Sequence, residues 1–355
     1  MALPVRPPLP PMLARLAREI PRGDYLYEPK WDGFRALVFR DRDDVDIRSR
    51  HDRPLARYFP ELVGAFRALA RDALVVDGEI VIAGPAGFDF AAVMLRLHPS
   101  ASRVERLARE TPASFIAFDL LAEGDTDLRE RAFGERRARL ERVLAAAPAA
   151  MRLSPATREP RVALEWLARA TGGGADGIVA KPLGAPYRAG ARAMTKVKTE
   201  RTADCVVGGM RLLADGASLG SLVLGLYDDA GAFRHVGVIV SFSDAVRREL
   251  PRTLAALVVD LAGHPWAGGF GIGRSPVGRL GGSAGRWDPA TMVPDWIPLR
   301  PELVVEVSYD TLDGERFRHP ARFRRWRPDR EPRSCGFDQL ATAPAPSIAE
   351  LLRTA

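Results

Sequence analysis

The sequence contains very few cysteines and no long apolar run. Its 355 residues include only Cys205 and Cys335, which cannot build a disulfide framework or a four-cysteine zinc site. The five histidines lack the spacing of metal ligands. No apolar run reaches the length of a membrane span, and prolines interrupt the N-terminal segment where a signal peptide needs apolar residues. We therefore expect a cytoplasmic protein with no membrane partner.

Lysine is also scarce. Of the 52 Lys and Arg residues only four are lysines: Lys30, Lys181, Lys196 and Lys198. A primary amine can lose its proton and act as a nucleophile, whereas a guanidinium effectively cannot. Because arginine serves everywhere else, these four positions are candidates for chemistry that needs an amine. For any one of them taken alone, chance retention is the alternative.

The overall composition is that of a globular protein large enough for two domains, with 46% hydrophobic and 27% charged residues. The formal net charge is +7 and the pI is near 9.8. Such a balance is compatible with a polyanionic partner such as nucleic acid, but many basic proteins bind none.

Residues 1–200 mix helices and strands without a regular βαβ alternation, which favours the α+β class. The first 22 residues are expected to form an extended arm and a short helix. Helices are then expected at residues 61–71, 89–97, 102–109, 128–146 and 162–170, and strands at 24–50, 74–83, 114–122, 177–181 and 195–199.

After about residue 201 strands dominate, with one helix expected at 244–261 and a Gly-, Pro- and Trp-rich loop at 263–300. Two later strands are joined by a turn at Asp313 and Gly314. About five strands with one helix suit a small barrel such as the OB-fold. The expected organisation is one domain over 1–200, a barrel domain over 201–330 and a peripheral tail over 331–355.

Five short motifs follow one another along the chain, and together they contain all four lysines. They are KWDGFR from Lys30, VDGEIVI around Glu79, FIAFDLL around Phe118, DGIVAK from Asp176 and TKVK ending at Lys198. With this ordered series the chain resembles the covalent nucleotidyltransferases, the superfamily of DNA ligases and capping enzymes. It is most similar to the compact bacterial ATP-dependent ligases called ligase C. The resemblance runs from about Leu26 to Arg330 and implies an adenylation domain followed by an OB-fold domain.

The resemblance implies that Lys30 attacks the α-phosphate of ATP and carries AMP as a phosphoramidate. The attacking amine must be neutral, so nearby positive charge must help it to lose a proton. The resemblance places Lys196 and Lys198 at the nucleotide phosphates and Asp32 and Arg35 beside Lys30. Further nucleotide-binding residues implied by the resemblance are Glu28, Arg50, Glu79, Phe118, Val179 and Lys181.

Within that set, Phe118 would stack on adenine with Val179 on the other face, although an aromatic in a strand is more often part of a core. Glu28 would accept a hydrogen bond from the adenine amino group, which favours ATP over GTP. Arg35 and Arg50 would contact the ribose and later the 5′-phosphate of a nick.

Glu79 and Asp176 are the candidate metal residues. Both are hard oxygen donors of the kind that Mg²⁺ prefers, and Mn²⁺ is the alternative ion. The resemblance puts Glu79 near the ribose and Asp176 at the metal. The superfamily usually has Glu where Asp176 stands, so the shorter side chain changes the metal geometry.

The C-terminal motif contains Arg327, Asp329 and Arg330. The superfamily usually has Lys in place of Arg330, and an arginine can also bind pyrophosphate oxygens. The resemblance implies that Asp329 and Arg330 act only in the first step, through a domain closure that brings them to the pyrophosphate.

The function expected is sealing of nicks between 3′-hydroxyl and 5′-phosphate ends of double-stranded DNA, in DNA repair. The enzyme is expected to act as a monomer, and the sequence does not indicate which proteins it binds. An RNA ligase or a capping-type guanylyltransferase is the nearest alternative. A catalytically inactive nucleic-acid-binding OB protein is the alternative of another class.

Two further signals are interpreted as structural. The segment GGFGIGRSPVGRLGGSAG lacks the flanking strand and helix of a dinucleotide site and is expected to be a loop, whose Arg274, Arg279, Arg286 and Trp287 could contact DNA. The basic segment 129–142 also carries acidic residues and is expected to be a solvated helix face.

Overall fold

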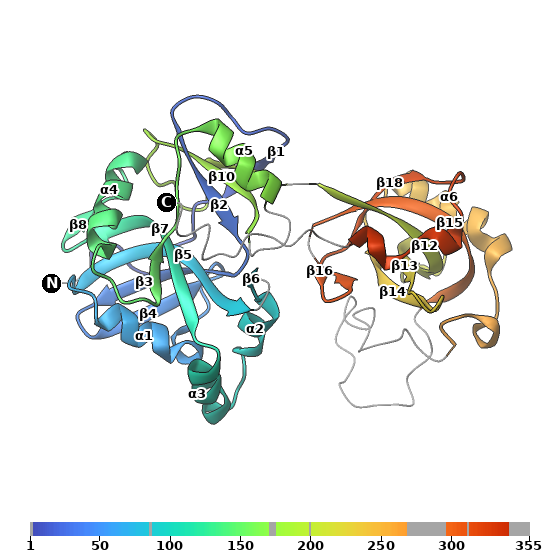
Figure 1. The fold of residues 1–355 in the computed structure, drawn as a ribbon, viewed down its shortest axis with the longest axis horizontal. Helices are drawn as coiled ribbons and strands as arrows, with labels where there is room; N and C mark the ends of the chain where they lie inside the picture. The colour runs from blue at the N-terminus through green and yellow to red at the C-terminus, as the bar shows by residue number, and fades with distance from the viewer. Residues whose placement is uncertain are drawn as a thin grey trace. The chain divides into compact units, whose positions relative to one another are not determined.

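The computed structural model describes residues 3–84, 87–169, 175–198, 200–267, 296–310 and 312–340. By their contacts these residues divide into two compact units, with the boundary after residue 199. The first unit contains two β-sheets with helices on their outer faces, and the second contains one curled sheet (Figure 1). The α+β class predicted from the sequence is confirmed.

The larger sheet of the first unit has seven strands. They are β3 (Phe34–Asp41), β4 (Asp44–Ser49), β5 (Ala73–Gly84), β6 (Gly87–Phe88), β7 (Ala113–Glu123), β8 (Thr126–Asp127) and β9 (Met151–Leu153). The main path runs β4-β3-β5-β7-β8, with β6 paired to β5 and β9 paired to β7. Along β3 the buried residues alternate, so that Ala36 and Val38 join one core cluster while Leu37 and Phe39 join another. Both faces of this sheet are therefore covered.

The smaller sheet has four strands in the order β1-β11-β10-β2. They are β1 (Ala14–Ala17), β2 (Tyr25–Trp31), β10 (Ala175–Pro182) and β11 (Met194–Val197). The prediction of a short helix within the first 22 residues was wrong, because Ala14–Ala17 pairs in parallel with β11 as an edge strand. The residues ARLA have a high helix propensity, but hydrogen bonding to the backbone of β11 favours the strand. The preceding segment, up to Met12, is the predicted extended arm, and its Val5, Leu9 and Met12 are buried.

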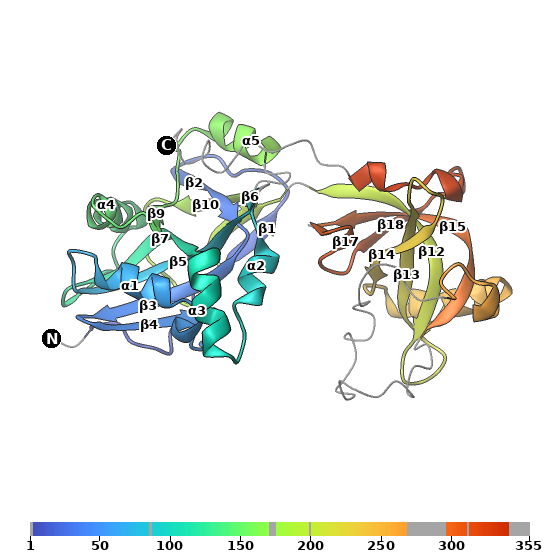
Figure 2. The same cartoon turned by 60° about the horizontal axis from the view of Figure 1, so that its bottom comes forward.

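Helices cover the outer faces of both sheets (Figure 2). They are α1 (Pro60–Arg67), α2 (Phe90–Leu95), α3 (Ala101–Glu110), α4 (Phe133–Leu144) and α5 (Pro160–Arg169), with the 3₁₀ turn η1 (Ala56–Tyr58) before α1. Phe66 of α1 and Leu140 of α4 share a core with the larger sheet, and Trp166 of α5 packs with Tyr27 of the smaller sheet. The other faces of the two sheets meet, since Leu37 of β3 and Met194 of β11 share a cluster.

The second unit is a five-stranded antiparallel sheet in the order β14-β13-β12-β15-β18. Its strands are β12 (Arg201–Leu212), β13 (Leu219–Tyr227), β14 (Phe233–Ile239), β15 (Ile297–Tyr309) and β18 (Arg322–Trp326). A bridge between Ile239 and Ala321 connects the two edges, so the sheet curls toward a barrel. The small hairpin of β16 (Leu312–Asp313) and β17 (Arg316–Phe317) turns at the predicted position, with Gly314 at a φ of 60°.

The helical part of the second unit is α6 (Asp244–Leu254), continued by the 3₁₀ turns η2 (Ala255–Leu257) and η3 (Leu261–Gly263). Two more 3₁₀ turns, η6 (Pro332–Ser334) and η7 (Phe337–Leu340), end the described chain. Cys335 and Leu340 are buried in the barrel core. Residues 332–340, expected in a peripheral tail, therefore belong to the packed unit because they bring apolar side chains to it.

The rest of that tail, residues 341–355, lies outside the described residues, as does most of the loop expected at 263–300. The four residues of that loop proposed to contact DNA are among those not described. Trp266 and Trp296, which flank the undescribed part, are both buried in the barrel core.

Candidate active site

Lys30 lies on β2 and pairs with a carboxylate of the neighbouring strand. Its Nζ is 2.6 Å from Oδ1 of Asp176, and Nζ of Lys198 is 2.8 Å from Oδ2 of the same residue. Burial alone would raise the pKa of Asp176, but the two ammonium groups outweigh it and hold this pKa below its usual value. Asp176 therefore joins two of the four lysines through one ionised carboxylate.

A β-bulge explains how Asp176 reaches this position. Between Ala175 and Ile178 the strand β10 has one residue more than its partner β2. Gly177 lies in this bulge with a φ of 155°, and a Cβ there would clash with the carbonyl oxygen of Val197. The glycine of the DGIVAK motif is thus required by backbone conformation and by the close approach of β11.

Lys196 lies in a row of residues across the smaller sheet. It is in register with Val179 of β10, and Val179 is in register with Glu28 of β2. Partners in register share a face of the sheet, so these side chains lie on the side that meets the larger sheet. Burial and the charges of Lys30 and Lys198 lower the pKa of Lys196. The structure thus brings Lys30, Lys196 and Lys198 close together.

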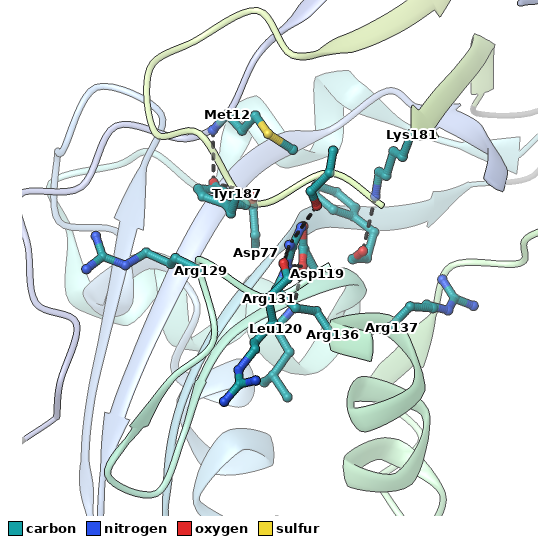
Figure 3. A network of polar contacts seen from close by, with 12 residues as sticks. Met12, Asp77, Asp119, Leu120, Arg129, Arg131, Arg136, Arg137, Lys181 and Tyr187 are labelled. Atoms are coloured by element: carbon teal, nitrogen blue, oxygen red, sulfur yellow. Dashed lines mark hydrogen bonds and ion pairs between the residues drawn. The ribbon is translucent and has the colours of Figure 1, made fainter. Parts of the chain in front are cut away.

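Arg35 of β3 is held by a fully buried carboxylate (Figure 3 shows that carboxylate and its further partners). Its Nε and Nη2 donate to the two oxygens of Asp77 on β5, at 3.0 and 2.7 Å. The hydroxyl of Tyr187 donates to Oδ2 of Asp77 at 2.7 Å and accepts from the backbone N–H of Met12 at 2.9 Å. Burial opposes the charge of Arg35, but Asp77 outweighs it and raises the pKa of the guanidinium.

Glu79 is next to Arg35 on the same sheet and is in register with it. Its Oε1 accepts from the backbone N–H of Gly33 at 3.1 Å, and a Cβ on Gly33 would clash with the carbonyl oxygen of Ile80. Burial raises the pKa of Glu79 to about 8, although Lys30 and Arg35 act in the opposite direction. At neutral pH this carboxyl is therefore mostly protonated in the free protein.

Phe118 lies in the site rather than in the core. It is half-buried, whereas Phe115 of the same strand is fully buried in the core cluster. The guanidinium carbon of Arg35 is 5.3 Å from the Phe118 ring centroid, and Nζ of Lys181 is 4.4 Å from it. The interpretation of Phe118 as a simple core aromatic is thereby excluded.

Glu28 and Lys181 form a buried pair behind Phe118. Nζ of Lys181 donates to both oxygens of Glu28, at 3.1 and 3.0 Å, and to the carbonyl oxygen of Phe118 at 3.1 Å. These three bonds use all three hydrogens of the ammonium group. Burial lowers the pKa of Lys181, although the charge of Glu28 acts in the opposite direction.

Two arginines of α4 are buried beside this pair or its neighbour Asp119, although segment 129–142 was predicted to be a solvated basic helix face. Arg136 is fully buried and makes two hydrogen bonds to Asp119, at 2.8 and 2.9 Å (Figure 3). Arg137 donates to Glu28 at 3.4 Å and to the carbonyl oxygen of Ser154 at 2.7 Å. For these two arginines the prediction was wrong, because a guanidinium can be buried when carboxylates and carbonyls use its donors, whereas Arg131 and Arg142 are exposed as predicted.

The remaining predicted residues of the first unit are less enclosed. Arg50 is exposed in the turn after β4 and forms no hydrogen bond or ion pair with the described residues. Its charge nevertheless contributes to the lowered pKa of Lys196, which places it near the lysine group. Asp32 is half-buried just after β2, and its negative charge contributes to the raised pKa of Glu79.

The C-terminal motif forms a separate ionic cluster within the second unit. Arg327 donates to both oxygens of Asp204 at 3.0 Å and to Asp329 at 2.8 Å. Nε of Arg330 is 3.7 Å from Asp204. The hydrogen bond from Arg327 lowers the pKa of Asp329 to about 2. Asp204 was not singled out from the sequence, because an acidic residue in a strand gives no sign of its partner.

Asp77 and Tyr187 were also missed as candidates, although Asp77 stands in the VDGE motif. A buried aspartate in a strand needs a counter-charge, and that rule could have indicated a partner for Asp77. Across the described ranges, no group of three His, Cys, Asp or Glu side chains is arranged to hold a metal. Within the same ranges no helix is both long and apolar enough to cross a membrane.

Two family models cover most of the chain. The ATP dependent DNA ligase domain matches residues 11–198, and the ATP dependent DNA ligase C terminal region matches residues 215–330. DNA ligase C2 of Mycolicibacterium smegmatis is 51% identical over 346 residues, covering 97% of each chain. DNA ligase C of Mycobacterium tuberculosis is 47% identical over 357 residues, covering 99% of each chain.

A solved Lig E DNA ligase aligns with 89% of this chain and 99% of its own length, with a TM-score of 0.55. At 18% identity that likeness shows the fold alone. It agrees with the predicted adenylation domain followed by an OB-fold domain, and the resemblance to ligase C is confirmed by the two mycobacterial relatives. The chain belongs to the ATP-dependent DNA ligase family.

Proposed function

We propose that the chain seals nicks in double-stranded DNA, using ATP to form a lysyl-AMP intermediate on Lys30. The observation that carries this proposal is the convergence of Lys30 and Lys198 on Asp176, with Lys196 beside them. A nucleophilic amine surrounded by cationic groups suits attack on a polyphosphate.

The first step forms a bond between Nζ of Lys30 and the α-phosphorus of ATP and breaks the bond to pyrophosphate. Nζ must first lose a proton to solvent, and Asp176, whose pKa is held below its usual value, orients the amine at 2.6 Å rather than taking that proton. Lys196 and Lys198 would bind the phosphate oxygens, where negative charge develops as pyrophosphate leaves.

In the second step a 5′-phosphate oxygen of the nick attacks the α-phosphorus and the P–N bond to Lys30 breaks. In the third, the 3′-hydroxyl attacks that 5′-phosphate and AMP leaves. We assign Arg35 and Arg50 to the ribose and the nick phosphate, because Arg35 is held in a fixed orientation and Arg50 is exposed near the lysines.

The half-buried ring of Phe118 is a platform on which adenine can stack, with Val179 on the opposite face. Glu28 keeps lone pairs beyond those used by Lys181 and Arg137, and one of them can accept from the adenine amino group. Lys181 would act on the base through Phe118 and Glu28, since its own donors are already used.

Asp176, which is ionised, would hold a Mg²⁺ or Mn²⁺ ion that takes one carboxylate together with substrate phosphates, and Glu79 would join it only in its ionised form. Such an ion would offset negative charge on the phosphates when bound. We place the enzyme in the cytoplasm as a monomer that acts in DNA repair.

The test is incubation with α-labelled nucleotide and a nicked duplex, following protein label and sealed product. ATP should label the protein and seal the DNA, and GTP should label at least about tenfold less because guanine presents an acceptor toward Glu28. Equal labelling by GTP would indicate a guanylyltransferase, sealing of RNA alone an RNA ligase, and no labelling an inactive binding protein.

A further inference from the structure

Tyr187 connects the N-terminal arm to the candidate active site. It lies between β10 and β11 and is 3% exposed. Its hydroxyl donates to Oδ2 of Asp77 at 2.7 Å and accepts from the backbone N–H of Met12 at 2.9 Å. The one donor and an acceptor position of this hydroxyl are therefore both used (Figure 3).

Asp77 transmits this contact to Arg35. The Asp77 side chain is fully buried, and it accepts two hydrogen bonds from Arg35 in addition to the one from Tyr187. The three residues come from β3, β5 and the segment between β10 and β11, so no single element fixes their geometry. A buried carboxylate with a third donor is held in one rotamer, and a bidentate guanidinium follows the plane of its carboxylate.

The arm is tied to the same place by further contacts. The backbone N–H of Leu13 donates to the carbonyl oxygen of Ala191, and that of Met194 donates to the carbonyl oxygen of Leu13. Met12 is itself buried in the cluster that contains Tyr187. The position of the Tyr187 hydroxyl thus depends on the arm as well as on its own strand segment.

We propose that Tyr187 is a positioning residue for Arg35, acting through Asp77, and that the N-terminal arm is part of this device. The inference rests on the proposed function, in which Arg35 contacts the ribose and the nick phosphate. Tyr187 touches neither; it sets the orientation in which the Arg35 donors face the substrate.

The decisive variant is Tyr187→Phe, which removes only the hydroxyl. The rate of the step that Arg35 serves should fall roughly tenfold, the scale of a lost hydrogen bond to a charged group. Protein labelling by ATP and sealing of a pre-adenylated nick are measured separately, and the step slowed by Arg35→Lys should be the one slowed by Tyr187→Phe.

The matched control is Tyr27→Phe. Tyr27 is fully buried in the same unit, and its hydroxyl donates to the carbonyl oxygen of Pro21 at 2.7 Å, away from Arg35. The Tyr27→Phe variant measures the effect on stability and rate of losing a buried tyrosine hydroxyl that is not bonded to Asp77. We expect this variant to seal nicks at the wild-type rate and to have a melting temperature comparable to that of Tyr187→Phe.

A double-mutant cycle separates positioning from a general structural role. In an Arg35→Gln background, Tyr187→Phe should cause no further loss of rate. A loss of the same size in both backgrounds, or a Tyr187→Phe rate equal to that of the control, would overturn the inference.

A readout that does not depend on activity accompanies the kinetics. Exchange of the Arg35 Nε proton with water, followed by nitrogen-15 NMR, should be faster in Tyr187→Phe than in Tyr27→Phe. Unchanged exchange would contradict the inference even if the wild type proved unable to seal DNA. A wild type that fails to label with ATP, with faster exchange in Tyr187→Phe, would instead count against the proposed function alone.

Discussion

At the residue scale, one carboxylate balances the charge around Lys30. Asp176 contacts Nζ of both Lys30 and Lys198, and Lys196 is close enough to both for their charges to lower its pKa. Without Asp176, the positive charges of these three amines would repel one another before any phosphate arrived. The carboxylate therefore keeps the three lysine side chains close together in the free protein.

This role predicts different results for two substitutions of Asp176. Asp176→Asn removes the negative charge, so AMP labelling should fall by an order of magnitude or more, and unfolding free energy by about 1 kcal/mol because the amines are partly exposed. Asp176→Glu keeps the charge and restores the residue usual in the superfamily, so labelling should stay within about threefold of wild type. Quench-flow labelling and thermal melts check both, and equal labelling by the Asn variant would refute the assignment.

The sequence predicted the residues of the site better than their partners. Lys30, Asp176, Lys196 and Lys198 lie in short motifs whose chemistry can be interpreted locally, and the structure brings them together. Tyr187 is different. Its significance depends on Asp77, 110 positions away in the chain, and nothing in a linear pattern reports such a pair.

At the element scale, most strands could be predicted from the alternation of apolar and polar residues, but β1 could not. Ala14–Ala17 has only four residues and no alternation of apolar and polar side chains that would indicate a strand. Its conformation is decided by pairing with β11. Arg136 and Arg137 of α4 were similarly misassigned, since their burial depends on Asp119 and Glu28 of other elements.

The bulge in β10 gives a prediction about an element rather than a side chain. Gly177→Ala places a Cβ against the carbonyl oxygen of Val197 at a φ that alanine rarely adopts. We expect a loss of about 2 kcal/mol in unfolding free energy and weaker AMP labelling, because Asp176 would be displaced.

Gly184→Ala is the control, since a Cβ there meets no heavy atom within 4 Å. Chemical denaturation of both variants measures the difference. Equal stability of the two would show that the bulge does not require glycine.

The barrel core predicts a pH dependence of stability. Burial, with the charge of Arg316, lowers the pKa of His235 on β14 from 6.5 to about 4. The unfolded chain then binds a proton that the folded one does not between these values, so stability is present above pH 6.5 and is lost as pH falls toward 4. The full effect is about 3 kcal/mol.

His235→Gln should remove this slope, while His319→Gln, at an exposed position of the same unit, should keep it. Thermal melts followed by tryptophan fluorescence between pH 7 and 4.5 make the comparison. A slope retained by His235→Gln would assign the acid sensitivity to other groups.

At the scale of the whole molecule, the first unit is expected to serve every step, whereas the C-terminal motif of the second unit is expected to serve only the first. Asp329 and Arg330 belong to the second unit, and we propose that they act on the pyrophosphate of ATP. Asp329→Ala and Arg330→Ala should therefore slow AMP labelling tenfold or more but still seal a pre-adenylated nick. Arg300→Ala, an exposed residue paired with Glu302, is the control. Equal loss in both assays would mean that the two residues only maintain the barrel.

The site of the AMP adduct tests the proposed role of Lys30 most directly. The protein is incubated with ATP and Mg²⁺, digested, and its peptides are analysed by mass spectrometry, alongside the Lys30→Arg variant, which keeps the charge but loses the reactive amine. We predict one adenylyl group on Lys30 of the wild type, none on the variant, and no nick sealing from ATP by the variant. An adduct on Lys181, Lys196 or Lys198, or sealing from ATP by Lys30→Arg, would contradict the assignment of Lys30 as the nucleophile.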